Sequence, residues 1–198
     1  METRTVSKDQ LQFRGDGNVI AYLPNEDTPF TGRAEDFYDN GHKESETNFK
    51  DGKENGLTTD WYENGQKMGE ENYKDGKLDG LTTRWYENGK NMAKMNFKDG
   101  EPDGLATLWD ENGKKEGELN YKDGKEDGLS AHWYENGQKE AEGNWKDGKV
   151  MSAVGWKPNG EKCPVTSVKN GNGVKLWYIL GSTQVIRETY KDGKLVKD

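Results

Sequence analysis

The side chains best suited to catalysis are two histidines and a single cysteine, His42, His132 and Cys163. Nucleophilic catalysis would need a histidine beside the cysteine or a serine, with an acid to orient the imidazole. The two histidines fall at unrelated positions of an internal repeat, and the position of His132 carries Asp, Arg or Leu in neighbouring copies. Zinc needs three or four clustered ligands, which these residues do not supply. We therefore expect no catalytic residue, no metal site and no cofactor.

The acidic turns offer a second kind of chemistry, calcium binding. Asp75, Asp79 and Gly80 match the first, fifth and sixth positions of an EF-hand loop. Lys77 stands at the third ligand position, and no Glu follows at the twelfth. Asp-Gly pairs are also ordinary turn residues, because Asp bonds its own backbone and Gly accepts a positive φ. We therefore expect turns here and no calcium.

Aromatic residues make the most regular candidate binding surface. They form two adjacent rows, Trp61, Trp85, Trp109 and Trp133 beside Tyr62, Tyr86 and Tyr134. In one interpretation a row is simply core, since aromatic rings supply most of the burial in a thin sheet. In the other, an outward-facing row binds an extended partner, because exposed Tyr and Trp are typical binding anchors. Both interpretations can hold, one for each face.

The tryptophans recur every 24 residues, and a fixed period of this size marks a repeat architecture. The segment from Leu57 to Tyr62 is rich in β-branched and aromatic residues, which favour a strand. Asn64-Gly65 predicts a two-residue type I′ hairpin turn, followed by a return strand from Lys67 to Tyr73. The expected fold is all-β, an elongated single-layer antiparallel β-meander or solenoid of about seven β-hairpin repeats of 22–24 residues.

A two-residue turn fixes the register within each copy and brings the Leu and Trp positions onto one face. The predicted cross-strand pairs are Trp61–Met68, Thr59–Glu70, Leu57–Asn72 and Tyr73–Gly56. A large ring lying over Gly56 would explain why glycine recurs before leucine. A regular Asn position predicts an internal hydrogen-bonded ladder, formed by Asn48, Asn72, Asn96, Asn120 and Asn144.

The repeat divides the chain into three predicted parts. Residues 1–31 form an N-terminal capping hairpin, residues 32–150 five regular 24-residue repeats, and residues 151–198 two degenerate repeats and a cap. The hairpin, with a turn at Gly15-Asp16-Gly17, is expected to cover the first sheet edge. In the last copy Gly181-Ser182 replaces Asn-Gly. A strand near residues 194–196 could pair with a second copy, so the oligomeric state stays open.

The composition limits the classes of partner that we expect the chain to bind. The formal net charge of −8 and the pI near 5.0 argue against nucleic acid and anionic membranes and are compatible with a basic protein. Charged residues reach 33%, yet aromatic residues at 11% occupy fixed positions, which argues against disorder. The sequence has no run of 18 apolar residues and so predicts no transmembrane segment. The expected location is cytoplasmic if Met1 is the native start, and periplasmic or secreted if a signal peptide was removed.

The motif Gly-Leu-x-x-x-Trp-Tyr-Glu-Asn-Gly followed by Asn-Tyr-Lys-Asp-Gly-Lys-x-Asp-Gly resembles the bacterial variant of the MORN repeat (membrane occupation and recognition nexus). The resemblance covers about residues 30–195. Arrays of this repeat are commonly labelled YwqK-type toxin–antitoxin antitoxins. The resemblance implies an array of β-hairpins that serves as a binding scaffold and not as an enzyme.

Two functions follow from these observations. The first is a non-enzymatic scaffold that binds a protein partner, with an antitoxin or immunity protein against a basic, toxin-like partner as its specific form. The alternative is a carbohydrate or cell-envelope binding module that uses exposed aromatic rows. A neighbouring toxin gene would favour the first, and a native signal peptide would favour the second.

Overall fold

The computed structural model describes residues 4–15, 19–178 and 185–196. The predicted turn residues Asp16, Gly17, Gly181 and Ser182 lie outside the described residues, as does Met1. The chain divides into two compact units, Met1–Glu101 and Pro102–Asp198. Apart from one short 3-10 turn, η1 (Lys8–Gln10), the regular structure in the described ranges is entirely β-strand. No helix in these ranges has the length and apolar character needed to cross a membrane.

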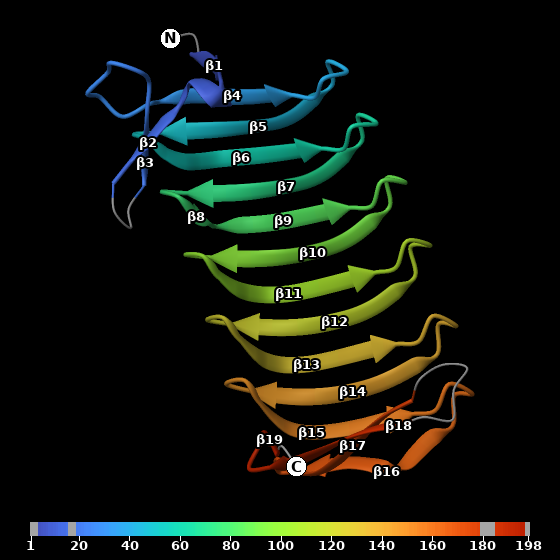
Figure 1. The fold of residues 1–198 in the computed structure, drawn as a ribbon. Helices are drawn as coiled ribbons and strands as arrows, with labels where there is room; N and C mark the ends of the chain where they lie inside the picture. Colours follow the sequence, from blue (N-terminus) through green and yellow to red (C-terminus); the bar gives the residue numbers. More distant parts are fainter. Residues whose placement is uncertain (1–3, 16–18, 179–184, 197–198) are drawn as a thin grey trace. The chain divides into compact units, whose positions relative to one another are not determined.

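In the first unit an antiparallel meander runs in chain order from β4 to β10 (Figure 1). Its strands are β4 (Gly32–Phe37), β5 (Lys43–Lys50), β6 (Lys53–Trp61), β7 (Lys67–Lys74), β8 (Lys77–Leu78), β9 (Gly80–Trp85) and β10 (Asn91–Lys98). Both β8 and β9 pair with β7, so together they make one outgoing strand interrupted at Asp79.

The second unit repeats this arrangement from β11 to β16. Its strands are β11 (Glu101–Trp109, whose first residue belongs to the first unit), β12 (Lys115–Lys122), β13 (Lys125–Trp133), β14 (Lys139–Lys146), β15 (Lys149–Trp156), β16 (Lys162–Lys169), β17 (Asn172–Tyr178), β18 (Val185–Lys191) and β19 (Lys194–Val196). Successive strands pair antiparallel. The predicted all-β meander is confirmed.

The turn at Asn64-Gly65 differs from the predicted type I′ turn. Positive φ occurs at Gly65 (82°) but not at Asn64, and the Gly65 amide donates to the Tyr62 carbonyl at 2.8 Å. This is a longer loop with one left-handed glycine, and it is accompanied by a bulge after Asp60. Trp61 therefore pairs with Lys67, and the predicted Trp61–Met68 pair is wrong. The pairs Thr59–Glu70, Leu57–Asn72 and Gly56–Tyr73 are confirmed.

The two-residue type I′ turn lies instead at the Asp-Gly pairs. Asp75 and Gly76 both have positive φ, 52° and 82°, and they join the paired residues Lys74 and Lys77. In three such turns the amide of the turn Asp donates a hydrogen bond to the carboxylate of an Asp that lies 20 residues earlier. These bonds are Asp99 to Asp79 at 3.3 Å, Asp123 to Asp103 at 3.4 Å and Asp147 to Asp127 at 3.3 Å.

The glycine before each leucine is required by the backbone and not by an overlying ring. Gly80 has φ 118°, and a Cβ at this position would lie 3.2 Å from the Asn72 Cβ. The Asn72 side chain donates to the Leu81 carbonyl at 2.8 Å, and Asn48 and Asn120 make the equivalent bonds to Leu57 and Leu129 at 2.6 and 2.7 Å. The asparagine ladder thus bonds to backbone of the next repeat, where a left-handed glycine bends the strand.

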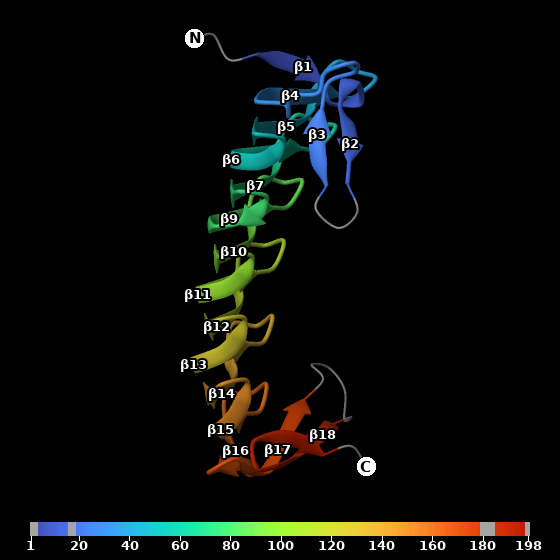
Figure 2. The same cartoon turned by 90° about the vertical axis from the view of Figure 1, so that its left-hand side faces the viewer.

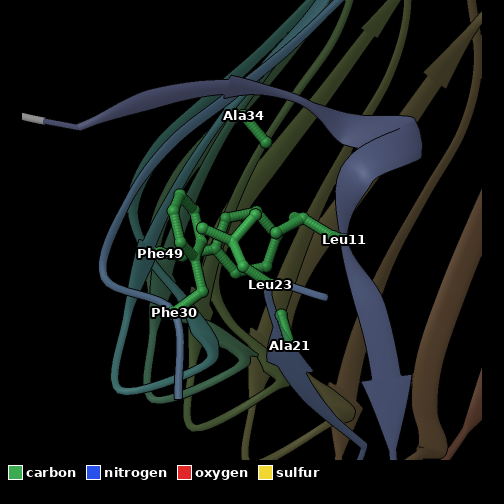
Figure 3. Close-up of a cluster of buried hydrophobic side chains, with 6 residues drawn as sticks. All are labelled: Leu11, Ala21, Leu23, Phe30, Ala34 and Phe49. Atoms are coloured by element: carbon green, nitrogen blue, oxygen red, sulfur yellow. The ribbon is translucent and has the colours of Figure 1, made fainter. Parts of the chain in front are cut away.

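The N-terminal segment covers one face of the first unit. β2 (Gln12–Arg14) and β3 (Ile20–Tyr22) form a hairpin that stands against the sheet face (Figure 2). Beneath it the largest buried cluster gathers around Phe30 and Phe49, whose ring centroids lie 5.9 Å apart (Figure 3). The edge strand β4 is covered by β1 (Thr5–Ser7), which pairs with it in parallel. The expectation that the hairpin itself covers the edge is therefore wrong, because β1 occupies that position.

In the second unit β17 and β18 leave the plane of the preceding strands and pack across their face (Figure 2). Gly155 allows the close approach at this corner, since a Cβ there would lie 2.9 Å from the Thr166 methyl carbon. Val150, Ala153 and Val168 are buried under the packed strands, with Trp145 and Tyr190 against them. Each unit thus has one face that is covered locally by a strand pair of the same unit.

Candidate functional site

Strand alternation gives each sheet two chemically different faces. We call the side that carries the Leu and Trp rows the Trp face. Its leucines remain open to solvent, with exposed fractions of 40%, 44%, 44% and 64% for Leu57, Leu81, Leu105 and Leu129. Its tryptophans, Trp61, Trp85, Trp109 and Trp133, are half-buried. The row predicted as core or binding surface is therefore neither fully buried nor freely exposed.

On the Trp face, lysine and glutamate side chains form ion pairs. Lys43 bonds Glu46 and Glu35 at 2.6 and 2.9 Å, and Lys139 bonds Glu142 at 2.7 Å. The pairs Lys67–Glu70 and Lys115–Glu118 repeat the pattern. The ammonium also lies over the next tryptophan in three cases, at 5.5 Å for Lys43 on Trp61, 5.4 Å for Lys115 on Trp133 and 5.5 Å for Lys139 on Trp156. These contacts are favourable electrostatically, and they leave the glutamates of this face paired.

The tyrosine row links successive repeats. The Tyr62 hydroxyl donates to the Trp85 carbonyl at 2.8 Å, and Tyr38 and Tyr134 donate to the carbonyls of Trp61 and Trp156 at 2.7 and 2.8 Å. Tyr134 is 6% exposed and Tyr62 and Tyr86 are half-buried. These hydroxyls bond carbonyls that lie one residue beyond the last pair with the preceding strand. For Tyr62 and Tyr134, the structure therefore shows a role inside the sheet.

The opposite side, which we call the Thr face after its buried residues Thr47 and Thr58, carries unevenly paired charge in the first unit. Glu54, Asp60 and Glu71 lie on it, half-buried, on the neighbouring strands β6 and β7. Burial raises the pKa of Glu54 and of Asp60, and the charge of Glu71 raises both further. Glu71 is the exception that has partners, since it accepts from Tyr73 at 2.6 Å and from Arg84.

The Thr face of the second unit holds a buried lysine. Lys175 of β17 is 8% exposed, and its ammonium lies 3.4 Å from the centroid of the Trp177 ring. Burial lowers its pKa to about 8, while the nearby carboxylates of Glu188, Glu140 and Glu126 oppose that shift. The Trp177 ring meets His132 edge-on, with 5.7 Å between centroids. Burial, together with the charge of Lys175, lowers the pKa of that histidine.

The three residues weighed for catalysis have separate surroundings. His42 is exposed in a turn, with Nδ1 2.8 Å from the Glu63 carbonyl oxygen. Cys163 is buried, with Sγ 3.1 Å from the Tyr178 hydroxyl, while His132 packs against Trp177. Within the ranges that the structure describes, no group of three or more His, Cys, Asp or Glu side chains is arranged to hold a metal ion.

Sequence reasoning missed Glu54 and Lys175 as site residues. Glu54 and Glu126 stand two positions before the recurring glycine, at equivalent places in two repeats, and both carboxyls have a pKa raised by burial. Lys175 follows Gly173 as Thr58 follows Gly56. This alignment could have indicated a buried lysine, because Thr58 is also buried. The indication becomes clear only when the structure shows which residues lie on each face of the sheet.

The comparisons with known proteins agree with the repeat. A family model described as MORN repeat variant matches five segments, residues 30–51, 54–75, 78–99, 102–123 and 126–147, which together span more than half of the chain. No curated protein has a matching sequence. The matched segments each contain one Trp-position strand, its turn and the return strand.

Proposed function

Since the chain belongs to the MORN repeat variant family, we propose that it is a non-enzymatic repeat scaffold that binds a protein partner. The observation that carries the proposal is the half-open Trp face, where exposed leucines lie beside half-buried tryptophans in both units. Surfaces of this composition are typical of binding sites, because aromatic anchors are partly ordered before the partner arrives. The candidate contact residues are Trp61, Tyr62, Trp85, Tyr86, Trp109, Trp133 and Tyr134.

Within this proposal residues 1–31 act as the N-terminal cap, residues 32–150 as the regular binding array and residues 151–198 as the degenerate C-terminal repeats and cap. The packing of the β2–β3 hairpin and of β17–β18 over sheet faces supports this division. Terminal repeats of an array are expected to be atypical, because one side of each must face water.

The specific form of the proposal is an antitoxin or immunity role against a basic protein. The formal net charge of −8 supports a basic partner, since opposite charge accelerates association and excludes acidic competitors. The carbohydrate alternative is less well supported. Sugars stack on open aromatic faces, and the ammonium groups of Lys43, Lys115 and Lys139 lie over three of the tryptophan rings.

The test is capture of partners from source-cell lysate on the intact immobilised chain, with single variants Trp85→Ala and Tyr86→Ala checked for folding by circular dichroism. We expect one specific protein to be retained and its retention to fall strongly with folded Trp85→Ala. A matched control is Leu195→Ala, an exposed apolar residue of β19 outside the regular repeats. Retention of insoluble envelope material with no protein would overturn the scaffold proposal in favour of carbohydrate binding.

A further inference from the structure

We propose that the Thr face of the first unit, around Glu54, Asp60 and Glu71, is a docking site for a lysine- or arginine-bearing segment of a protein partner. The proposal rests on the scaffold function above and assigns its basic partner to the face opposite the Trp row.

The charge balance of the two faces differs. On the Trp face of the first unit, Glu35, Glu46 and Glu70 each have a lysine partner, and Lys94 adds a further positive charge. On the Thr face, Glu54 and Asp60 have no hydrogen-bonded cation within the part of the chain that the structure describes, and Lys8 of η1, joined by Arg84 in the case of Asp60, acts on them only through space. A basic segment therefore gains most on the Thr face, because the half-buried carboxylates of Glu54 and Asp60 still lack a charge-assisted hydrogen bond.

Two buried hydroxyls border these carboxylates. Ser45 and Thr58 are 5% and 7% exposed, and their side-chain oxygens have no hydrogen-bond partner. In register Ser45 lies opposite Asp60, and Thr58 lies opposite Glu71, on the same face. Buried hydroxyls are normally bonded, so these two unsatisfied ones, beside Asp60 and Glu71, show that hydrogen bonding on this part of the Thr face is incomplete.

The second unit shows what such a surface accepts. Glu126 occupies the repeat position of Glu54, and above it the chain places its own Lys175 from β17. The lysine ammonium lies over the Trp177 ring, within reach of the charges of Glu126, Glu140 and Glu188. An extended strand with a lysine on its inner side therefore fits this face, and in the first unit the equivalent carboxylate of Glu54 has only the more distant charge of Lys8.

A pocket adjoins the carboxylates and gives the segment an apolar floor. It has a volume of about 670 Å³ and lies between the hairpin and the turns that follow β5 and β7. Phe13, Val19 and Phe49 line it together with two carboxylates, Glu54 and Asp75, and two lysines, Lys53 and Lys77. Long basic side chains bury their methylene stems on apolar surface while the charged end reaches a carboxylate. Phe13, Val19 and Phe49 thus offer apolar surface for such a stem, with the Glu54 carboxylate beside it.

The test uses the full chain and hexalysine as the probe, with binding measured by calorimetry and mapped by amide chemical shifts. We expect hexalysine to perturb β6, β7 and β9 amides and to bind about tenfold more weakly when Glu54→Gln, Asp60→Asn and Glu71→Gln are combined. The matched control removes three exposed turn charges, Glu63→Gln, Glu87→Gln and Glu135→Gln, and should weaken binding less than about twofold.

Glu54→Gln alone covers the case in which the triple variant misfolds, because no hydrogen bond of the Glu54 side chain is lost. It should weaken hexalysine binding and leave the circular dichroism spectrum unchanged. Equal weakening by the Thr-face and turn variants would overturn the docking site, since it would show general attraction to an acidic protein. Absence of binding would also overturn it. Either result leaves the scaffold proposal standing if lysate capture still depends on Trp85, so the two failures are distinguishable.

Discussion

At the scale of single residues, the most strained electrostatic position is Lys175. A buried ammonium loses hydration, and here the loss outweighs the attraction of three nearby carboxylates because the pKa falls to about 8 from an ordinary 10.5. The unfolded chain therefore binds more protons than the folded chain between pH 8 and 10.5. By proton linkage, stability increases with pH across this window.

We expect the free energy of unfolding of the wild type to rise relative to that of Lys175→Met as the pH increases from 8 to 9.5. The wild type should gain about 1.5 kcal/mol relative to the variant over this interval. Urea unfolding of both proteins at four pH values measures the difference. Tyrosine titration is common to both and cancels. A difference that does not vary with pH would show that the lysine is not held in its buried position.

The same residue shows how far sequence reasoning reaches. Alignment of the degenerate last copy with the regular ones places Lys175 at the Thr58 position, but lysine is ordinarily assigned to solvent. Its burial depends on β17 and β18 folding across the sheet face, which is a contact between strands far apart in sequence. The Trp and Tyr rows were predictable as rows. The tyrosine bonds to the next Trp carbonyl were not, because each of them joins residues of two successive repeats that lie 22 or 23 positions apart in the sequence.

At the scale of the elements, glycine positions decide the strand geometry. Gly69 of β7 and Gly80 of β9 lie on paired strands but differ in backbone conformation. Gly80 has a φ of 118°, whereas the φ of Gly69 is not positive. A Cβ on Gly80 would also meet the Asn72 Cβ at 3.2 Å, whereas one on Gly69 would find ordinary contacts at 3.8 Å and beyond. The two sites therefore form a matched pair for substitution.

We expect Gly80→Ala to destabilise the protein by about 1–3 kcal/mol, because alanine is strained at this φ. Gly69→Ala should change stability by less than about 1 kcal/mol, and in the stabilising direction, because alanine lowers the entropy of the unfolded chain. Chemical unfolding of both variants provides the comparison. Equal destabilisation would mean that the loss arises from crowding on the sheet and not from the left-handed backbone.

Turn chemistry also explains where the sequence prediction of the elements was wrong. Asn-Gly and Asp-Gly are both type I′ signals, and the prediction assigned this turn to Asn64-Gly65. In the structure Asp75-Gly76 adopts it, while Asn64 uses its side chain to accept from the Gln66 amide at 2.9 Å. That bond favours a longer loop and a one-residue bulge. The predicted strands and the residues assigned to each face are still correct, because the change of register affects only the pair next to the loop.

At the scale of the whole molecule, the repeats behave as interchangeable modules in their contacts. Tyr38 bonds the Trp61 carbonyl as Tyr62 bonds that of Trp85. The cross-strand pair Ser45–Asp60 likewise recurs one repeat later as Gly69–Arg84. In such arrays stability is approximately a sum of repeat and nearest-neighbour contributions. Removal of one whole repeat should therefore rebuild equivalent contacts at the new junction.

We expect deletion of Gly56–Asp79, one full 24-residue repeat inside the first unit, to give a folded β protein with lower stability. The new neighbour Trp85 takes the place of Trp61, and Thr82 takes the place of Thr58 opposite Thr47. A half-repeat deletion, Gly56–Lys67, is the control, since it removes one strand and reverses the direction of the next. It should abolish cooperative unfolding, measured by circular dichroism during heating.

The full-repeat deletion also separates fold from binding, because it removes Asp60 and Glu71 but keeps Glu54 and the N-terminal hairpin. Strand content should be retained per residue while hexalysine affinity falls toward that of the triple Thr-face variant. If the deletion protein unfolded without cooperativity, the modular account of stability would be wrong. If it folded and bound hexalysine as tightly as the intact chain, the carboxylates of β6 and β7 would not be the docking site.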